Sequence, residues 1–161
     1  MDFSSNAVNL CNKKYSIPNL TFCQGDAESM SFGDGSFDFV LNVESSHCYG
    51  SMENFVSEVV RVLKPGGIFS WADFRLQDKI PALNRVFSKS GLQLIRENEI
   101  TPNVICALDS MSDRKIKLIK ELKPKFLSNI FINFAGVKGS KIYNAFQSGK
   151  IIYLSKVFKY N

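Results

Sequence analysis

A strand, a helix and a second strand are expected within residues 37–73, which read FDFVLNVESSHCYGSMENFVSEVVRVLKPGGIFSWAD. The run at 37–43 is rich in Phe, Val and Leu, and this predicts a strand that is buried on both faces. From Ser51 onward, apolar residues recur at three- and four-residue steps, which predicts a helix that stops at the Pro-Gly-Gly of 65–67. The run at 68–72 predicts the second strand. A helix between two strands indicates an open, mostly parallel α/β sheet.

The flanking sequence continues this alternation. Helices are expected at 5–15, after serines that can cap a helix, and at 78–90. Strands are expected at 20–24, 92–96 and 151–158. The last two strands can pair in antiparallel fashion, because a long segment separates them.

The composition changes between residues 101 and 149. A basic amphipathic helix is predicted at 114–123, whose charges form either a solvated face or a docking face for an anionic or membrane surface. The run at 126–134 is more apolar than a surface loop requires. We therefore expect residues 101–149 to form a helical cap insertion over the functional end of the sheet, within one domain that spans 1–161.

The composition excludes several classes of protein. The chain has 161 residues, 45% hydrophobic and 22% charged, with a net charge of +5, which suits one globular domain. It has no apolar run long enough to span a bilayer and no signal peptide at its start, so we expect a cytoplasmic location. No basic-aromatic pattern indicates nucleic-acid binding, and nothing in the sequence indicates an oligomeric state.

The cysteines argue against a metal centre. They are far apart and form no Cys-x-x-Cys pair, so we expect no metal and no disulfide framework, but buried free thiols. The four are Cys11, Cys23, Cys48 and Cys106.

Polar residues follow the predicted strands at the places where ligands bind in an open α/β sheet. They occur at 24–28, at 42–47 and at 72–75, and the start of the chain at 2–4 could end a further strand. Because parallel strands end at the same edge of a sheet, we expect these residues to gather there.

These same stretches resemble class I S-adenosylmethionine-dependent methyltransferases. The central block of that superfamily is similar to GDAESMSFGDGSFD at 25–38, and its helix-turn-strand is similar to RVLKPGG at 61–67. Within the superfamily, NVESSH at 42–47 and ADFR at 72–75 resemble the phthiotriol/phenolphthiocerol dimycocerosates methyltransferase-like branch, and the likeness continues through 135–143. The resemblance implies a Rossmann-like sheet and S-adenosylmethionine as the cofactor.

The resemblance also implies a nucleoside site near the start of the chain. Asp2 matches the acidic residue that binds both ribose hydroxyls, a task for which a carboxylate has enough acceptor positions. Phe3 would lie along the adenine ring. Asp26 matches the carboxylate that receives the adenine amino group, with the Ala27 amide beside it. From the residues alone, Asp26 could equally be a turn residue after Gly25.

At the next strand end, the resemblance implies that Asn42, Val43 and Glu44 line the methionine part of the cofactor. His47 is the only histidine in the chain, and related sugar and polyketide O-methyltransferases use a histidine here as general base, oriented by an aspartate that Asp73 matches. An imidazole titrates near neutrality and can take the proton of a hydroxyl as it attacks a methyl group. Glu44 is the competing base, although a role as cofactor ligand or structural residue suits it better.

The chain departs from the family pattern at its start. The family opens with a strand and a Gly-x-Gly-x-Gly loop, and the only similar spacing here, Gly33-x-Gly35, falls in a turn between two strands. We therefore expect a sheet without the first strand and the glycine loop. Two functions stay open: O-methylation of a hydroxyl on a small hydrophobic or lipid-like molecule, or a catalytically silent fragment that acts by protein–protein interaction.

Overall fold

The computed structural model describes residues 1–121 and 136–161. Its helices and strands, in chain order, are α1 (Ser5–Lys14), β1 (Phe37–Val43), α2 (Met52–Val62), β2 (Leu63–Leu76), α3 (Ile80–Lys89), β3 (Leu92–Glu99), α4 (Thr101–Glu121), α6 (Lys141–Gln147) and β4 (Ile151–Tyr160). Short 3-10 helices cover Ser46–Cys48 and Gln77–Lys79.

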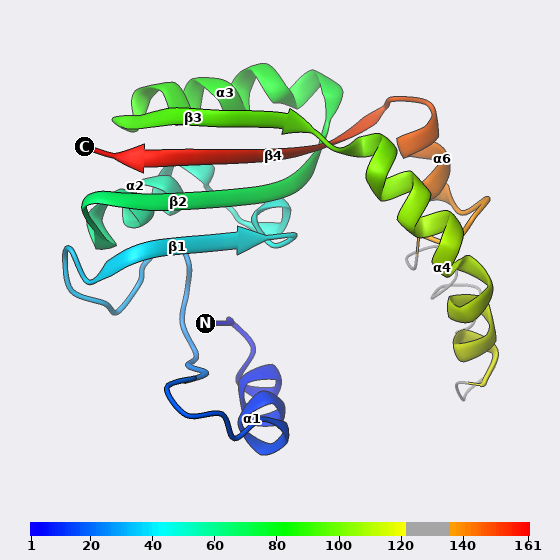
Figure 1. Ribbon diagram of the computed structural model, residues 1–161, viewed down its shortest axis with the longest axis horizontal. Helices are drawn as coiled ribbons and strands as arrows, with labels where there is room; N and C mark the ends of the chain where they lie inside the picture. The colour runs from blue at the N-terminus through cyan, green and yellow to red at the C-terminus, as the bar shows by residue number, and fades with distance from the viewer. Residues whose placement is uncertain (122–135) are drawn as a thin grey trace.

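The strands form one mixed sheet in the order β1-β2-β4-β3 (Figure 1). β1 and β2 are parallel, whereas β4 is antiparallel to both of its neighbours, β2 and β3. The structure confirms the predicted α/β class and the antiparallel pairing of the last two strands, but the described sheet is not mostly parallel, because β4 runs antiparallel to both β2 and β3. β2 is longer than the predicted 68–72, because its start pairs with Phe37 and its end pairs with Ile151.

The strand predicted at 20–24 is wrong. A strand needs a hydrogen-bonded neighbour, and within the described residues this segment forms only an isolated parallel bridge, between Gln24 and Asp2. The segment is an extended connection to the turn that follows Gly25.

The main core lies on the face of the sheet that α2 and α3 cover. Phe55 and Val59 of α2 and Phe87 of α3 pack against Phe69 and Trp71 of β2, and all are buried. Burial of this apolar surface is the main stabilising contribution to the fold. The side chain of Ser51 caps α2 by accepting a hydrogen bond from the backbone N–H of Asn54, as the sequence predicts.

The prediction that the strand at 37–43 is buried on both faces is wrong for the described structure, because one face of β1 has no element packed against it there. Side chains alternate between the two faces of a strand, and Phe39, Leu41 and Val43 point away from α2, with 54%, 63% and 51% of their surface exposed. β1 is also an edge strand of the described sheet.

The amino-terminal segment is attached to the rest of the molecule through α2. Arg61 donates hydrogen bonds to the backbone carbonyls of Met30 (2.9 Å) and Phe32 (2.7 Å) and to the carboxylate of Asp34 (2.8 Å). In Figure 1, α1 lies beyond the β1 edge of the sheet, away from the other helices.

α4 and α6 lie near the carboxyl ends of β1, β2 and β3 (Figure 1). Phe146 of α6 and Tyr153 of β4 form a second apolar cluster there, against which Phe74 packs. Both helices fall within the predicted cap of 101–149, and most of the predicted basic stretch lies in α4. The apolar run at 126–134 lies outside the described residues. None of the described helices combines the length and apolar character needed to cross a bilayer.

The cysteines differ from the prediction in one respect. All four are free, but none is fully buried, and Cys48 and Cys106 are exposed. Cys48 lies in the loop after β1, and Cys106 lies on an uncovered part of α4, so neither reaches a core.

Candidate active site at the carboxyl ends of the strands

The parallel pairing of β1 and β2 places the loop after β1 over the end of β2. The last bond between them is donated by the backbone N–H of Glu44 to the carbonyl of Ala72 (2.9 Å). Glu44 then adopts a left-handed backbone conformation with φ of 48°, which turns the chain out of the strand. As a result, the Nδ1 atom of His47 lies 2.8 Å from Oδ1 of Asp73.

The Asp73 side chain is completely buried and stays ionised. Burial by itself raises the pKa of a carboxyl group, but hydrogen bonds from Ser46 (2.7 Å) and His47, together with the charge of Arg75 (3.2 Å), outweigh it and lower the pKa of Asp73. The backbone N–H of His47 also donates to Oδ2 of Asp73 at 2.9 Å. A deprotonated carboxylate is therefore held beside the imidazole.

The His47 ring is fixed on one side and open on the other. It lies on the ring of Phe74 with centroids 4.3 Å apart, and 28% of its side chain is exposed. Nδ1 is taken by Asp73, while Nε2 has no hydrogen-bond partner among the described residues. With its proton on Nδ1, the ring presents a free lone pair on Nε2 to an incoming hydroxyl.

Glu44 and Tyr153 complete the charged surroundings of this site. Burial raises the pKa of the Tyr153 phenol, and so do the nearby carboxylates of Glu44 and Asp73. The three residues therefore meet at one place, although they come from the ends of β1, β2 and β4. Glu44 itself is exposed, and it lies beside the His47–Asp73 pair.

The residues predicted to hold a nucleoside lie in a second group. The bridge between Asp2 and Gln24 places Asp2 and Phe3 next to the turn that contains Asp26 and Ala27. Each aspartate uses one oxygen locally, Asp2 for the backbone N–H of Ser4 (2.7 Å) and Asp26 for that of Glu28 (2.9 Å). The second oxygen of each has no partner within the described part of the chain, and Phe3 is 77% exposed.

The two groups are joined only indirectly in the described structure. The carboxylate of Glu28, in the nucleoside group, accepts hydrogen bonds from the backbone N–H groups of Gly50 (2.7 Å) and Ser51 (2.9 Å). No hydrogen bond or ion pair among the described residues links Asp2 or Asp26 directly to the end of β1.

Asn42 offers a structural test of whether a cofactor suits this end of the sheet. Its side chain is buried, and its Nδ2 donates to the hydroxyls of Ser45 (2.8 Å) and Tyr49 (3.0 Å). Its Oδ1 is buried without a partner among the described residues, which is costly unless a ligand supplies a donor. An ammonium group, such as that of an amino-acid moiety, fits this acceptor. The neighbouring Val43 points to the other, bare face of the sheet.

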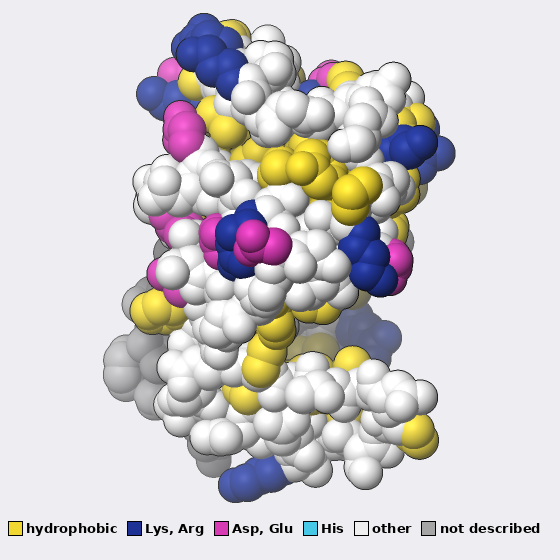
Figure 2. All heavy atoms as spheres, turned by 90° about the vertical axis from the view of Figure 1, so that its left-hand side faces the viewer, with side chains coloured by type: hydrophobic (Ala, Val, Ile, Leu, Met, Phe, Trp, Pro, Cys, Tyr) yellow, Lys and Arg dark blue, Asp and Glu magenta, His cyan; other side chains and the backbone are white. Residues whose placement is uncertain are grey.

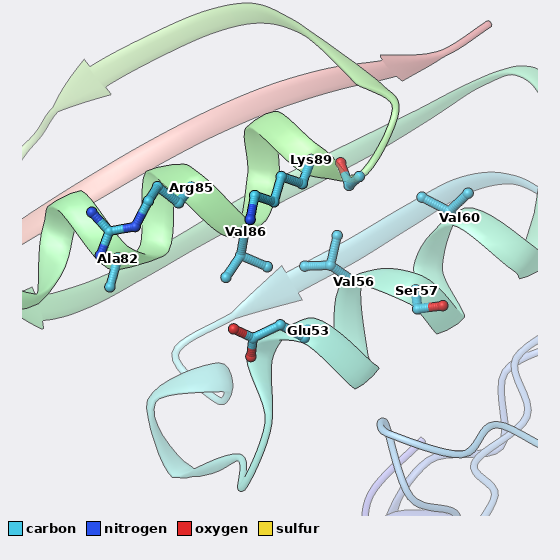
Figure 3. A pocket seen from close by; sticks show the side chains of 9 residues that line it. Glu53, Val56, Ser57, Val60, Ala82, Arg85, Val86 and Lys89 are labelled. Carbon is cyan, nitrogen blue, oxygen red and sulfur yellow. The ribbon is translucent and has the colours of Figure 1, made fainter.

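A surface groove elsewhere is separate from this site. It has a volume of about 450 Å³ and lies between α2 and α3, where Figure 3 shows Glu53 and Val56 on one side and Arg85 and Lys89 on the other. None of the predicted site residues lines it.

Four further residues contribute to the site without having been given a role from the sequence, although two of them, Ser46 and Arg75, fall in the polar stretches expected at this edge. They are Ser46, Trp71, Arg75 and Tyr153. A period of two along β2 relates Trp71, Asp73 and Arg75, so the sequence does indicate that these three share a face. No sequence signal relates Tyr153, on the antiparallel strand, to Glu44.

Comparison with known proteins agrees with this geometry. Residues 1–71 match a family described as "Methyltransferase domain". Over 153 residues, the chain is 36% identical to the phthiotriol/phenolphthiotriol dimycocerosates methyltransferase of Mycobacterium tuberculosis, an alignment that covers 95% of this chain and 57% of the relative. It is also 36% identical over 127 residues to the fatty-acid O-methyltransferase of Mycolicibacterium smegmatis, covering 79% and 46% of the two chains.

Among solved structures, the fold is similar to that of an O-methyltransferase from a polyketide synthase of Brevibacillus brevis in complex with S-adenosyl-L-homocysteine. The TM-score is 0.74 with 17% identity, and the match covers 98% of this chain and 57% of the other. The likeness is therefore one of fold. The chain spans about half the length of the curated relatives that it matches.

Proposed function

We propose that the chain is part of a class I S-adenosylmethionine-dependent methyltransferase and that it serves O-methylation of a hydroxyl group on a lipid-like molecule. The observation that carries this proposal is the 2.8 Å contact between His47 and a buried, ionised Asp73 at the carboxyl ends of the strands. This is the arrangement that a general base requires.

His47 acts as the base in this proposal. Its Nε2 takes the proton of the acceptor hydroxyl, while Nδ1 keeps its own proton and donates it in a hydrogen bond to Asp73, which holds the ring in place. A hydroxyl acceptor needs such a base because it is protonated at neutral pH. A carboxylate acceptor needs none, because it is already deprotonated. The His47–Asp73 pair therefore favours a hydroxyl over a fatty-acid carboxylate as the acceptor, although one relative carries the name of a fatty-acid methyltransferase.

S-adenosylmethionine, when bound, supplies an electrophilic methyl group. The chain's own residues that would hold it are Asp2 and Asp26 toward the nucleoside, and Asn42 and Glu44 toward the amino acid. Each of the two aspartates has a carboxylate oxygen without a partner in the described chain. The buried Oδ1 of Asn42 also has no partner there. Phe3 and the Ala27 amide would lie against the adenine.

Apolar side chains beside His47 support a lipid-like acceptor. The imidazole of His47 lies against the ring of Phe74. Phe74 in turn packs against Phe146 of α6, and the centroids of these two phenyl rings are 5.9 Å apart. An acceptor that reaches Nε2 would therefore lie beside apolar surface from the predicted cap of 101–149. The two curated relatives named above support the same class of acceptor by their names.

Two measurements test the proposal. Calorimetry of the 161-residue chain with S-adenosylmethionine should show binding, and radiolabelled methyl groups should transfer to long-chain alcohols in detergent micelles. His47→Ala should then lower kcat by about 10²–10⁴-fold with little effect on the Kd of the cofactor. Lys64→Gln, at the other end of the sheet, is the matched control. Unchanged turnover in His47→Ala would exclude His47 as the base.

The bare face of β1 favours a second candidate. Phe39, Leu41 and Val43 form an exposed apolar strip on an edge strand, and such strips mark surfaces that proteins bind. In this alternative, the chain is catalytically silent and acts through a protein partner that covers the strip. Two results together would favour this alternative over the enzyme: no binding of the cofactor, and a concentration-dependent association of the chain that Leu41→Lys abolishes.

A further inference from the structure

The Asp73 carboxylate has more partners than the orientation of one imidazole requires. Its Oδ1 faces Nδ1 of His47 (2.8 Å) and accepts from the backbone N–H of Phe74 (2.9 Å). Its Oδ2 accepts from the hydroxyl of Ser46 (2.7 Å) and the backbone N–H of His47 (2.9 Å), and Nη1 of Arg75 lies 3.2 Å away. Both oxygens are therefore saturated by donors.

The direction of each hydrogen bond in this network follows from its chemistry. The Oγ of Ser46 accepts from the indole Nε1 of Trp71 and from Nη2 of Arg75, both at 2.8 Å, and neither of these groups can accept. The single proton of the Ser46 hydroxyl must then point to Asp73. Since Asp73 is an acceptor at every contact, the Nδ1 of His47 carries the proton of that ring.

Arg75 is a fixed cation in this network. Its side chain is only 11% exposed, its guanidinium lies 5.3 Å above the centroid of the Trp71 ring, and its nitrogens donate to the carbonyl of Phe74 (2.7 Å) and contact Sδ of Met52 (3.3 Å). It cannot leave Asp73 without losing these contacts. The imidazole therefore gains its proton beside a nearly neutral pair and not beside an isolated anion.

Other charges near His47 are few among the described residues. Glu44 lies at the end of β1 and the phenol of Tyr153 comes from β4, while Phe146 is the neighbour that α6 presents to this cluster. Among the described residues, Arg75 is thus the fixed positive charge that contacts the His47–Asp73 pair.

We infer that Ser46 and Arg75 are positioning residues of the His47–Asp73 pair, which hold the Asp73 carboxylate as the acceptor of the Nδ1 proton and limit how strongly Nε2 binds a second proton. This inference rests on the proposed role of His47 as base. Ser46 and Arg75 act through Asp73 and need not touch an acceptor. In this arrangement, Asp73 orients the base, and Arg75 offsets the negative charge of Asp73.

Nuclear magnetic resonance of the 161-residue chain tests this directly, because its one histidine gives one set of ring signals. In the wild-type chain above the titration range, the ¹⁵N shifts of the ring should show the tautomer protonated on Nδ1. Arg75→Gln should raise the titration midpoint of the ring by about one pH unit, a roughly tenfold gain in proton affinity, since a nearby positive charge is removed. Ser46→Ala should keep that tautomer, because Oδ1 of Asp73 still accepts from Nδ1, and should raise the midpoint by less than Arg75→Gln, because it removes a hydrogen-bond donor to Asp73 and not a full charge.

The controls separate this inference from a loss of folding and from the proposed function. Lys64→Gln removes an exposed cation paired with Asp38 (2.8 Å) at the opposite end of the strands, a region where Figure 2 shows charges of both signs and no histidine, and it should leave the midpoint unchanged. If Arg75→Gln does not fold, the tautomer of the wild-type ring still tests the inference. A ring protonated on Nε2, or a midpoint that moves no more in Arg75→Gln than in Lys64→Gln, overturns the inference. These signals need no turnover. The inference can therefore be supported even if methyl transfer is not observed, and it can fail even if methyl transfer is observed.

Discussion

Replacing Asp73 by Asn should destabilise the fold strongly at neutral pH. Each hydrogen-bond partner of the Asp73 side chain in the described structure is a donor, so the amide nitrogen of an asparagine must face a donor whichever way it is turned. The replacement also leaves the buried cation of Arg75 without its counter-charge. Removing one member of a buried ion pair costs about 3–5 kcal/mol, and we expect a loss of this size in the free energy of unfolding at pH 7.

The same reasoning predicts how this loss depends on pH. The pKa of Asp73 is lower in the folded chain than its ordinary value, so its ionised form stabilises the fold. This contribution is complete above the unfolded pKa of about 3.9 and disappears as the pH falls through the folded pKa. The part of the difference between wild type and Asp73→Asn that comes from the ionisation of Asp73 should therefore be complete at pH 7 and shrink only below about pH 4.

The assay is urea unfolding followed by tryptophan fluorescence. Trp71 is the only tryptophan, is fully buried, and donates its indole N–H to Ser46, so it reports on the network itself. Asp38→Asn is the matched control, since that carboxylate is exposed, and it should change the urea midpoint very little. A loss below about 1 kcal/mol for Asp73→Asn at pH 7, or a loss of the same size at pH 3, would refute the reasoning.

Two further substitutions test how the site is held in place. In Gly67→Ala, the new Cβ would lie 2.8 Å from the backbone oxygen of Lys64 and 3.2 Å from that of Asp38, so chemical denaturation should show a loss of about 2 kcal/mol in the free energy of unfolding. Gly33→Ala is the control and should be nearly neutral, because its Cβ meets nothing closer than 3.5 Å. Equal losses in the two variants would contradict this account. Glu28→Gln keeps one acceptor oxygen and loses the charge that binds two backbone N–H groups at the start of α2, so it should cost about 1 kcal/mol and weaken cofactor binding severalfold in calorimetry. Unchanged cofactor affinity in a folded Glu28→Gln chain would show that the nucleoside group does not depend on its link to the start of α2.

Much of the fold could be predicted because local and long-range signals agree in it. In α2, the capping Ser51, the apolar spacing and the Pro-Gly-Gly stop all indicate the same helix, and the structure has it at Met52–Val62. The parallel order of β1 and β2 follows from the helix between them. The strand expected at 20–24 failed because strand propensity is satisfied only by a paired neighbour, and only Asp2 pairs with it among the described residues.

The candidate site could be predicted only in outline. His47 and Asp73 each follow from a strand end, and the structure brings them to 2.8 Å; their catalytic roles remain a proposal. The roles of Ser46 and Arg75 escaped prediction because their importance lies in a three-dimensional network that ends on Trp71, not in their position along the chain. The residue pattern showed where polar groups gather, but not which of them donate and which accept.

Arg61 has a consequence for the order in which parts of this chain open. Its guanidinium ties the backbone of residues 30–34 to α2, and Glu58 accepts the backbone N–H of Met30 at 2.6 Å. The amide hydrogen of Met30, which Glu58 accepts, should therefore exchange with solvent only when α2 itself opens, and so as slowly as those of the sheet. α1 has no comparable attachment in the described structure, and its amides should exchange much faster. The turn at 30–34 thus belongs to the cooperative unit of the sheet, and α1 forms a separate, weaker one.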